Sequence, residues 1–256
     1  MTQEEWKKIC SDVTAAMKDH TCRFVTPLST STDEEVRLVG SGTYVAIGEN
    51  RLLVTCEHVA REEPMEFRFY GCTSVFRHLK PFIMEPHPID IAFAPILDQF
   101  WTQNSHEAAA IPYERFAPRH QVAQKGELLF FRGYAGENAH YGFGIHETNG
   151  TGYCSQEKEP AQPDSQIFEI FWEPENSEFS GGTSENAKPQ IRFDDPAGFS
   201  GSLVWNTRYL EMTAEGRKWS PEDAVVTGIL RRFDPDTKSL LVLRAEHLRN
   251  WVEKQL

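Results

Sequence analysis

Three short segments each place one member of the serine, histidine and aspartate set beside strand-like apolar sequence. The segments are GSGTYVAIGENRLLVTCEHVA at 40–60, HPIDIAFAPI at 87–96 and DDPAGFSGSLVWN at 194–206. A serine hydroxyl becomes a strong nucleophile when an imidazole accepts its proton, and that imidazole needs a carboxylate to fix its tautomer. The pattern therefore indicates acyl transfer, with Ser200 as nucleophile, His58 as base and Asp90 as its carboxylate partner.

The backbone around Ser200 suits a second requirement of acyl transfer, a pair of N–H groups directed at the developing oxyanion. Gly198 lies two residues before the serine, where glycine permits the tight turn that points both groups inward. We expect the N–H groups of Gly198 and Ser200 to form this oxyanion hole. His58 follows the apolar stretch LLVTC, whereas Asp90 interrupts an apolar strand and so needs a buried partner; Asp98 is the rival carboxylate nearby.

Helical patterns are confined to the two ends of the chain. Apolar residues at spacings of four, three and four predict an N-terminal helix over 1–19, which Thr2 can cap. They are Trp6, Cys10, Val13 and Met17. A helical period returns over 245–255, so a second helix is expected at the C-terminal end.

Between the helices, short alternating stretches are separated by turn-forming residues, which is typical of strands. The expected strands are Cys22–Val25, Val36–Leu38, Gly42–Ile47, Arg51–Thr55, Met65–Tyr70, Ile89–Pro95, Glu127–Tyr134, Tyr141–Thr148, Gln166–Trp172, Leu203–Trp205, Ala224–Arg231 and Leu240–Arg244. Many short strands predict a mainly all-β protein with a barrel or sandwich architecture. The alternation breaks over 96–123, which predicts a domain boundary near residue 118, and Glu173–Lys188 reads as a mobile loop.

Composition narrows the partners of this protein. The 256 residues include 26 Lys and Arg against 38 Asp and Glu, a net charge of −12, which argues against nucleic acid as a partner.

Apolar runs fall far short of the roughly 20 residues that a membrane span needs. Five cysteines without a paired spacing, and an N-terminus without a secretory pattern, predict a cytoplasmic location. His140, His146 and Cys154 fit no standard zinc spacing, so neither metal nor cofactor is expected.

The motifs G-S-G-x-x-V, L-V-T-x-x-H-V, D-I-A and G-x-S-G-S follow one another in this order over about 36–244. The combination resembles the chymotrypsin-like (trypsin-like) serine endopeptidases, and it is closer to their bacterial, HtrA-like branch. The resemblance implies two antiparallel six-stranded β-barrels with the active site between them. It further implies that the first barrel, 20–118, carries His58 and Asp90, and that the second, 119–256, carries Ser200. The implied substrate is a protein or peptide.

The chain departs from that family at several positions. We expect no PDZ domain after the second barrel. Phe199 stands where digestive members have an aspartate that pairs with a new N-terminus, so activation through that ion pair is not expected. Glu57 precedes the histidine, where the family prefers a small residue. Asp194, six residues before Ser200, either forms the floor of a pocket for Lys or Arg side chains or caps a turn before Pro196.

Two alternatives remain beside an active, tightly regulated endopeptidase. An α/β-hydrolase would use Ser200, Asp223 or Asp234, and His247 in that order, but a strand rather than a helix is expected after Ser200. The other alternative keeps the fold as a latent or pseudoprotease binding module, a scaffold that an activating or sensor protein regulates. In that case the N-terminal helix and the loop at 173–188 would hold the cleft closed.

Overall fold

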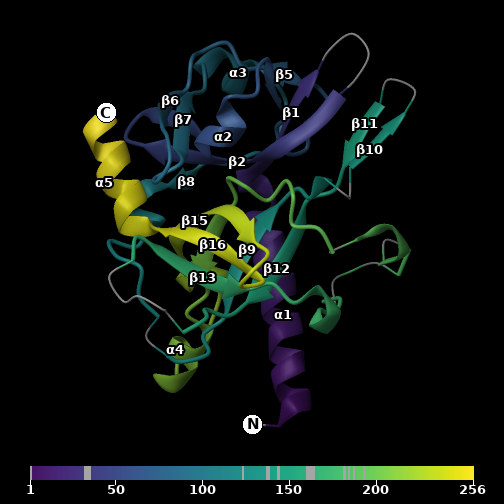
Figure 1. The fold of residues 1–256 in the computed structure, drawn as a ribbon, viewed down its shortest axis with the longest axis vertical. Coiled ribbons are helices and arrows are strands. Elements are labelled where there is room, and N and C mark those ends of the chain that lie inside the picture. Colours follow the sequence, from purple (N-terminus) through teal and green to yellow (C-terminus); the bar gives the residue numbers. More distant parts are fainter. Residues whose placement is uncertain are drawn as a thin grey trace.

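Two curled antiparallel sheets, with a helix at each end of the chain, make up the computed structural model (Figure 1). It describes residues 2–31, 36–122, 124–136, 139–142, 145–159, 165–180, 183, 185, 186, 188–192 and 194–256, with backbone alone for 139–142, 145–148 and 190. The mainly β fold with terminal helices confirms the expected chymotrypsin-like two-barrel class.

The N-terminal helix α1 (Gln3–Thr21) begins with a capping box, in which the Thr2 hydroxyl accepts a hydrogen bond from the Glu5 N–H and the Glu5 carboxylate accepts one from the Thr2 N–H. Val13 and Met17 of the predicted stripe are buried. The helix packs on strands β9 and β12 of the second sheet. The predicted helix is therefore confirmed, and it extends two residues beyond the expected end.

The first sheet has the strand order β5-β4-β1-β2-β3-β7-β6, and the short strand β8 pairs parallel with β2. Its strands are β1 (Val25–Ser31), β2 (Val36–Ile47), β3 (Asn50–Thr55), β4 (Met65–Phe67), β5 (Phe76–Arg77), β6 (Ile83–Glu85), β7 (Ile91–Pro95) and β8 (Ile111–Pro112). Two short helices, α2 (Glu57–Ala60) and α3 (Asp98–Gln103), follow β3 and β7. The sheet thus has eight strands within the described residues, two of them only two residues long.

The second sheet has six strands in the described part of the chain, in the order β12-β9-β14-β15-β16-β13. They are β9 (Leu129–Gly133), β12 (Thr151–Ser155), β13 (Ile167–Phe171), β14 (Leu203–Asn206), β15 (Val225–Asp234) and β16 (Ser239–Arg244). The segment after β12 bonds to β13, since the Lys158 N–H donates to the Glu169 carbonyl and the Phe171 N–H donates to the Gln156 carbonyl. These bonds join the two edges of the sheet and close it into a barrel.

The remaining elements are short. A separate hairpin consists of β10 (Ala139–Gly142) and β11 (Ile145–Thr148), and α4 (Tyr209–Ala214) follows β14. Single-turn 3₁₀ helices are η1 (Cys22–Phe24), η2 (Tyr113–Arg115), η4 (Pro174–Asn176), η5 (Lys188–Gln190) and η6 (Pro221–Asp223). None of the helices among the described residues combines the length and the apolar character that crossing a bilayer requires.

Three hydrophobic clusters hold these elements together. One lies within each barrel, and a third joins both barrels to the terminal helices. The C-terminal helix α5 (Ala245–Gln255) belongs to this third cluster: its Trp251 ring contacts Phe93 of β7, and its Leu248 is buried. Figure 1 shows α5 along the side where the two barrels meet. The joint core fixes one barrel against the other, which the site between them requires.

Several predicted elements differ in their bounds. Cys22–Val25 is not a strand, because residues 22–24 form η1 and β1 begins at Val25. Val36–Leu38 and Gly42–Ile47 belong to one continuous strand, β2, since the intervening Gly40 pairs with β1 instead of turning. The expected strand Tyr141–Thr148 lies partly outside the described residues.

Candidate active site

His58 and Asp90 form a close pair on the first barrel. His58 lies on α2, directly after β3, and Asp90 immediately precedes β7, which pairs with β3. The His58 Nδ1 atom is 3.0 Å from both Asp90 carboxylate oxygens, and the His58 N–H donates to Asp90 Oδ1 at 3.1 Å. Asp90 has a φ of 58°, which aspartate tolerates better than most residues. The paired strands thus bring together the two residues that the sequence predicted.

The electrostatics of Asp90 favour an ionised carboxylate. Its side chain is only 9% exposed, and burial by itself would raise the pKa of Asp90. The hydrogen bonds from His58, with the charges of His58 and Arg231, outweigh burial and hold this pKa below its ordinary value. The rival carboxylate, Asp98, lies on α3 and pairs with Arg51 at 3.0 Å. Asp90 is therefore the carboxylate that faces the imidazole.

Ser200 lies in the turn before β14 of the second barrel, where it contacts β2 of the first barrel. Its carbonyl accepts a hydrogen bond from the Ser41 N–H of β2 at 2.9 Å. Its hydroxyl donates to the backbone carbonyl of Arg231 at 2.6 Å. Among the described residues it forms no hydrogen bond with His58. The Arg231 side chain also forms an ion pair with Asp90, so Arg231 contacts both Ser200 and Asp90.

The turn before Ser200 has a backbone conformation at Gly198 that glycine adopts readily and other residues rarely do. Gly198 has a φ of 100°, and a Cβ there would lie 2.4 Å from the Tyr134 carbonyl oxygen. Within the described part of the chain, the N–H groups of Gly198 and Ser200 donate no hydrogen bond. Both groups therefore remain available to a ligand oxygen.

Phe199 replaces an ionic anchor with an aromatic one. The side chain is fully buried, and its ring lies 5.3 Å from the rings of both Phe131 and Tyr153 and 6.0 Å from Trp172. Edge-to-face packing of this kind stabilises a fixed orientation. The turn that carries Ser200 is thus held by a hydrophobic cluster.

Ser41 supports the same turn from the first barrel, a role that the sequence did not reveal. Its hydroxyl donates to the Gly198 carbonyl and accepts from the Tyr134 N–H, each at 2.8 Å. Gly201 leaves room for this contact, because a Cβ there would lie 2.1 Å from the Ser41 carbonyl oxygen. The motif G-S-G at 40–42 was the available signal, but it contains nothing that distinguishes its serine from an ordinary strand residue.

Two positions that the sequence marked as departures are accommodated differently. Glu57 is buried and forms an ion pair with Arg61 one helical turn later, so its charge does not disturb the packing beside His58. Asp194 is exposed, and the neighbouring Asp195 accepts a hydrogen bond from the Ala197 N–H at 2.8 Å, as in a capped turn. A hydrated carboxylate on the surface does not support a buried pocket that selects Lys or Arg side chains.

The residues of the alternative α/β-hydrolase order have structural partners. Asp223 accepts from the Ser220 N–H at the start of η6, and Asp234 accepts from the Asp236 N–H in the turn between β15 and β16. Ser200 is followed by strand β14, with no helix in between. The arrangement is therefore incompatible with a nucleophile elbow.

One group of potential metal ligands coincides with the site. Ligand atoms of Cys56, His58 and Asp90 all lie within 4.8 Å of one another. The Arg231 Nε atom lies 3.6 Å from Asp90 Oδ2, so a second cation there would meet a buried positive charge. Burial, followed by the charge of Asp90, raises the pKa of the Cys56 thiol well above its ordinary range and disfavours the thiolate that metals bind. We therefore interpret His58 and Asp90 as a hydrogen-bonded pair beside the buried Cys56 thiol, and not as metal ligands. The side chains of His140 and His146 lie outside the described residues.

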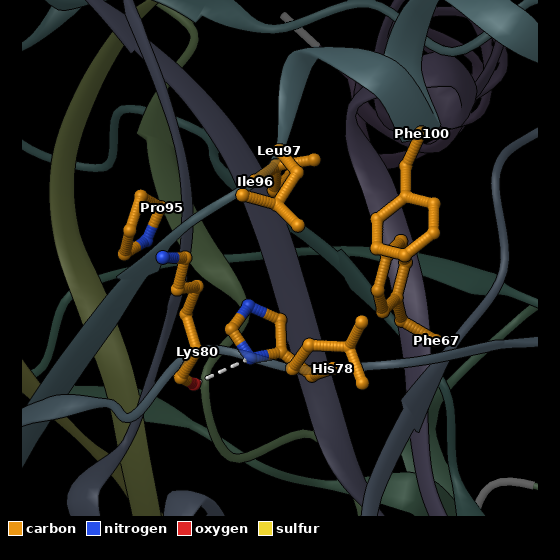
Figure 2. Close-up of a pocket in the computed structure, with 8 residues that line it drawn as sticks. Phe67, His78, Lys80, Pro95, Ile96, Leu97 and Phe100 are labelled. Carbon is orange, nitrogen blue, oxygen red and sulfur yellow. Dashed lines mark hydrogen bonds between the residues drawn. The ribbon is translucent and has the colours of Figure 1, made fainter.

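Another histidine, His78, is packed within the first barrel. Figure 2 shows His78 in the first barrel, beside Phe67 and below the Ile96–Leu97 backbone, with its Nδ1 bonded to the Lys80 carbonyl at 2.8 Å. The space among these residues has no room for a water molecule. Burial lowers the pKa of His78. A neutral, packed ring in a filled space has no evident chemical role.

The two segments named for latency contact each other. Lys7 of α1 forms an ion pair with Glu178, which lies in the loop after β13. Together α1, β12 and this loop line an open pocket of about 780 Å³. Tyr153 and Trp172 line it and also contact Phe199, so its wall adjoins the support of the Ser200 turn.

Comparison of the sequence with known protein families and with curated proteins finds no match in either set. Solved structures do match. The active form of the Rv3671c protease from M. tuberculosis has a TM-score of 0.54 and 16% identity, covering 94% of this chain and 84% of that one. An inactive serine-to-alanine mutant of Rv3671c from strain H37Rv gives 0.53 and 15%, over 95% and 92%. Neuropsin, a serine protease expressed in the limbic system of mouse brain, gives 0.53 and 14%, over 92% and 95%. The chain therefore has the fold of the chymotrypsin-like serine proteases.

Proposed function

We propose that this protein is a serine endopeptidase that cleaves protein or peptide substrates through an acyl-enzyme. The observation that supports this most directly is the His58–Asp90 pair, with both carboxylate oxygens 3.0 Å from Nδ1, in a two-barrel protease fold. Because Nδ1 faces Asp90, Nε2 is the ring nitrogen left to take a proton from Ser200. No metal or cofactor is required by this chemistry.

In the proposed reaction the Ser200 hydroxyl first turns from the Arg231 carbonyl toward His58. Its oxygen then bonds to the scissile carbonyl carbon as its proton passes to His58, and the N–H groups of Gly198 and Ser200 stabilise the resulting oxyanion. His58 returns the proton to the leaving amine, which departs with the electron pair of the broken C–N bond. Water repeats the sequence on the acyl-enzyme and regenerates the Ser200 hydroxyl.

A latent or pseudoprotease form of the same fold is the second candidate. The observation in its favour is the Ser200 hydroxyl itself, which donates to Arg231 and not to His58. An activating or sensor protein would be the partner in that case. The cytoplasmic setting and the kinship with the bacterial HtrA-like branch belong to this proposal as expectations from the sequence. Because Asp194 is exposed, we propose no preference for Lys or Arg in the substrate.

Covalent labelling tests the proposal. Wild type, Ser200→Ala and Ser202→Ala are treated with a fluorophosphonate probe, and the bound phosphonyl group is read from the intact mass. Ser202 is the matched control, since it lies two residues away, is fully buried and forms no side-chain hydrogen bond. Labelling of wild type and Ser202→Ala but not Ser200→Ala supports the proposal. Equal labelling of Ser200→Ala refutes the assignment of Ser200, and no labelling of any form refutes an active enzyme.

A further inference from the structure

We propose that Arg231 is a positioning residue: its buried guanidinium holds the Asp90 carboxylate against His58, while its backbone carbonyl holds the Ser200 hydroxyl. The inference rests on the proposed function and extends it to a residue that the sequence did not single out. Arg231 lies on β15, and its Nε atom is 3.6 Å from Asp90 Oδ2. Its carbonyl accepts the Ser200 hydroxyl at 2.6 Å.

The burial of this side chain is difficult to explain by stability. The Arg231 side chain is 2% exposed, and its Nε and Nη1 atoms form no hydrogen bond with any of the described residues. Among the described residues, Asp90 is its one ion-pair partner. Removing a cation from water without full hydrogen bonding is costly, and an apolar side chain of similar volume often gives a more stable protein. A charge kept in such a place points to a role in the site.

The guanidinium and the imidazole compete for one carboxylate. In the proposed reaction His58 becomes positively charged when it takes the Ser200 proton, and Asp90 stabilises that charge. The fixed cation behind Asp90 lies 3.6 Å from Oδ2 of the same carboxylate, so Asp90 serves two cationic partners at once when His58 is charged. The groups around His58 that carry or can carry charge are Asp90, Arg231, the buried thiol of Cys56, and the Glu57–Arg61 ion pair on its own helix.

The backbone of Arg231 explains the link to Ser200. Leu230 pairs with Val242 and Arg232 pairs with Leu241, so the register skips Arg231 in a bulge. Bulges re-aim side chains and free backbone groups from the ladder. The Arg231 carbonyl is thereby available to Ser200. Because a hydroxyl has one proton, Ser200 cannot donate to this carbonyl and to His58 at once.

The test compares Arg231→Met, which removes the charge at similar length, with Arg231→Lys, which retains it. Arg232→Met is the matched control, since Arg232 is the next residue of β15 and is exposed. Two readouts are taken: the pH dependence of fluorophosphonate labelling, and the NMR titration midpoint of the His58 ring. For Arg231→Met we expect the acid limb and the midpoint to move up by about one pH unit. Arg231→Lys should reverse most of the shift, and Arg232→Met should show none.

An unchanged titration midpoint in folded Arg231→Met overturns the proposal, and so does an equal shift in Arg232→Met. The NMR titration needs no nucleophile, so it remains informative if labelling shows the proposed function to be wrong. If the single variant Arg231→Met does not fold, the stability of the single variant Asp90→Asn is compared with that of the double variant that carries both substitutions. An unpaired buried cation should destabilise Asp90→Asn, and the double variant should regain part of the lost urea midpoint. Strictly additive losses would contradict the pairing.

Discussion

The hydroxyl of Ser41 should contribute more to stability than that of an ordinary buried serine, because it bonds to two backbone groups. They are the Gly198 carbonyl, in the turn before Ser200, and the Tyr134 N–H. Ser41→Ala removes a donor to the Gly198 carbonyl and an acceptor for the Tyr134 N–H, both at 2.8 Å. Ser41 is 1% exposed, so water cannot readily replace its hydroxyl. An unsatisfied buried group costs about 1–3 kcal/mol, so the pair should cost about 2–6 kcal/mol of unfolding free energy.

In a chain of this size, 1 kcal/mol corresponds to about 2–4 °C, so the melting temperature should fall by roughly 4–24 °C. Displacement of the Gly198 N–H should also slow fluorophosphonate labelling by about 10²-fold, the usual effect of one lost oxyanion donor. Unfolding is followed by urea titration and heating, and labelling by intact mass at fixed times.

Thr43→Val provides the control for Ser41→Ala. Thr43 lies two residues further along β2, is fully buried, and its hydroxyl makes no hydrogen bond. Replacement by a side chain of the same shape should therefore be neutral or slightly stabilising. If Ser41→Ala lost no more stability than Thr43→Val, or labelled at the wild-type rate, the role assigned to Ser41 would be wrong.

Two further outcomes test the surroundings of the site. Phe199→Ala should cost about 3–5 kcal/mol of unfolding free energy, measured in urea, because it empties the aromatic cluster behind Ser200; Phe171→Ala, at an exposed ring, should cost far less. Because the pKa of Asp90 lies below its ordinary value in the folded state, its contribution to stability is present above the unfolded pKa and is lost as pH falls through the folded one. Stability should decline below about pH 4, and Asp90→Asn should flatten that decline; an unchanged slope would count against the pairing.

Much of the fold was readable from local pattern. The C-terminal helix has the predicted bounds, Ala245–Gln255, because its apolar spacing is periodic and nothing interrupts it. His58 and Asp90, which the sequence singled out on strand-like segments, lie with Nδ1 3.0 Å from the carboxylate oxygens, whereas the nucleophilic role of Ser200 stays a prediction. Boundaries were less predictable where tertiary pairing overrides propensity. In β2, two glycines that look like turn residues remain in the strand because they allow close approach of Val59 and Leu53.

The supporting residues of the site could not be predicted in the same way. Arg231 is the last residue of the expected strand Ala224–Arg231, where an arginine is typical of the solvated end of a hairpin strand. The bulge that turns it inward depends on how β15 pairs with β16, and the distance to Asp90 depends on how one barrel packs on the other. Neither quantity is written in the local pattern of either segment, because each arises from contacts between distant parts of the chain.

The Ser200–Arg231 hydrogen bond can by itself lower the population of the competent site only to a limited extent. Such a bond contributes about 1 kcal/mol net, and a factor of ten in population requires about 1.4 kcal/mol. Turning Ser200 toward His58 therefore reduces the competent population by roughly fivefold, and the new bond to the imidazole offsets part of this. Slow labelling of wild type would agree with the Ser200–Arg231 hydrogen bond as the interaction that restrains Ser200. A complete lack of labelling would need a larger change, and the turn at Gly198 and Phe199, with its buried aromatic support, is the element whose displacement would remove the oxyanion donors.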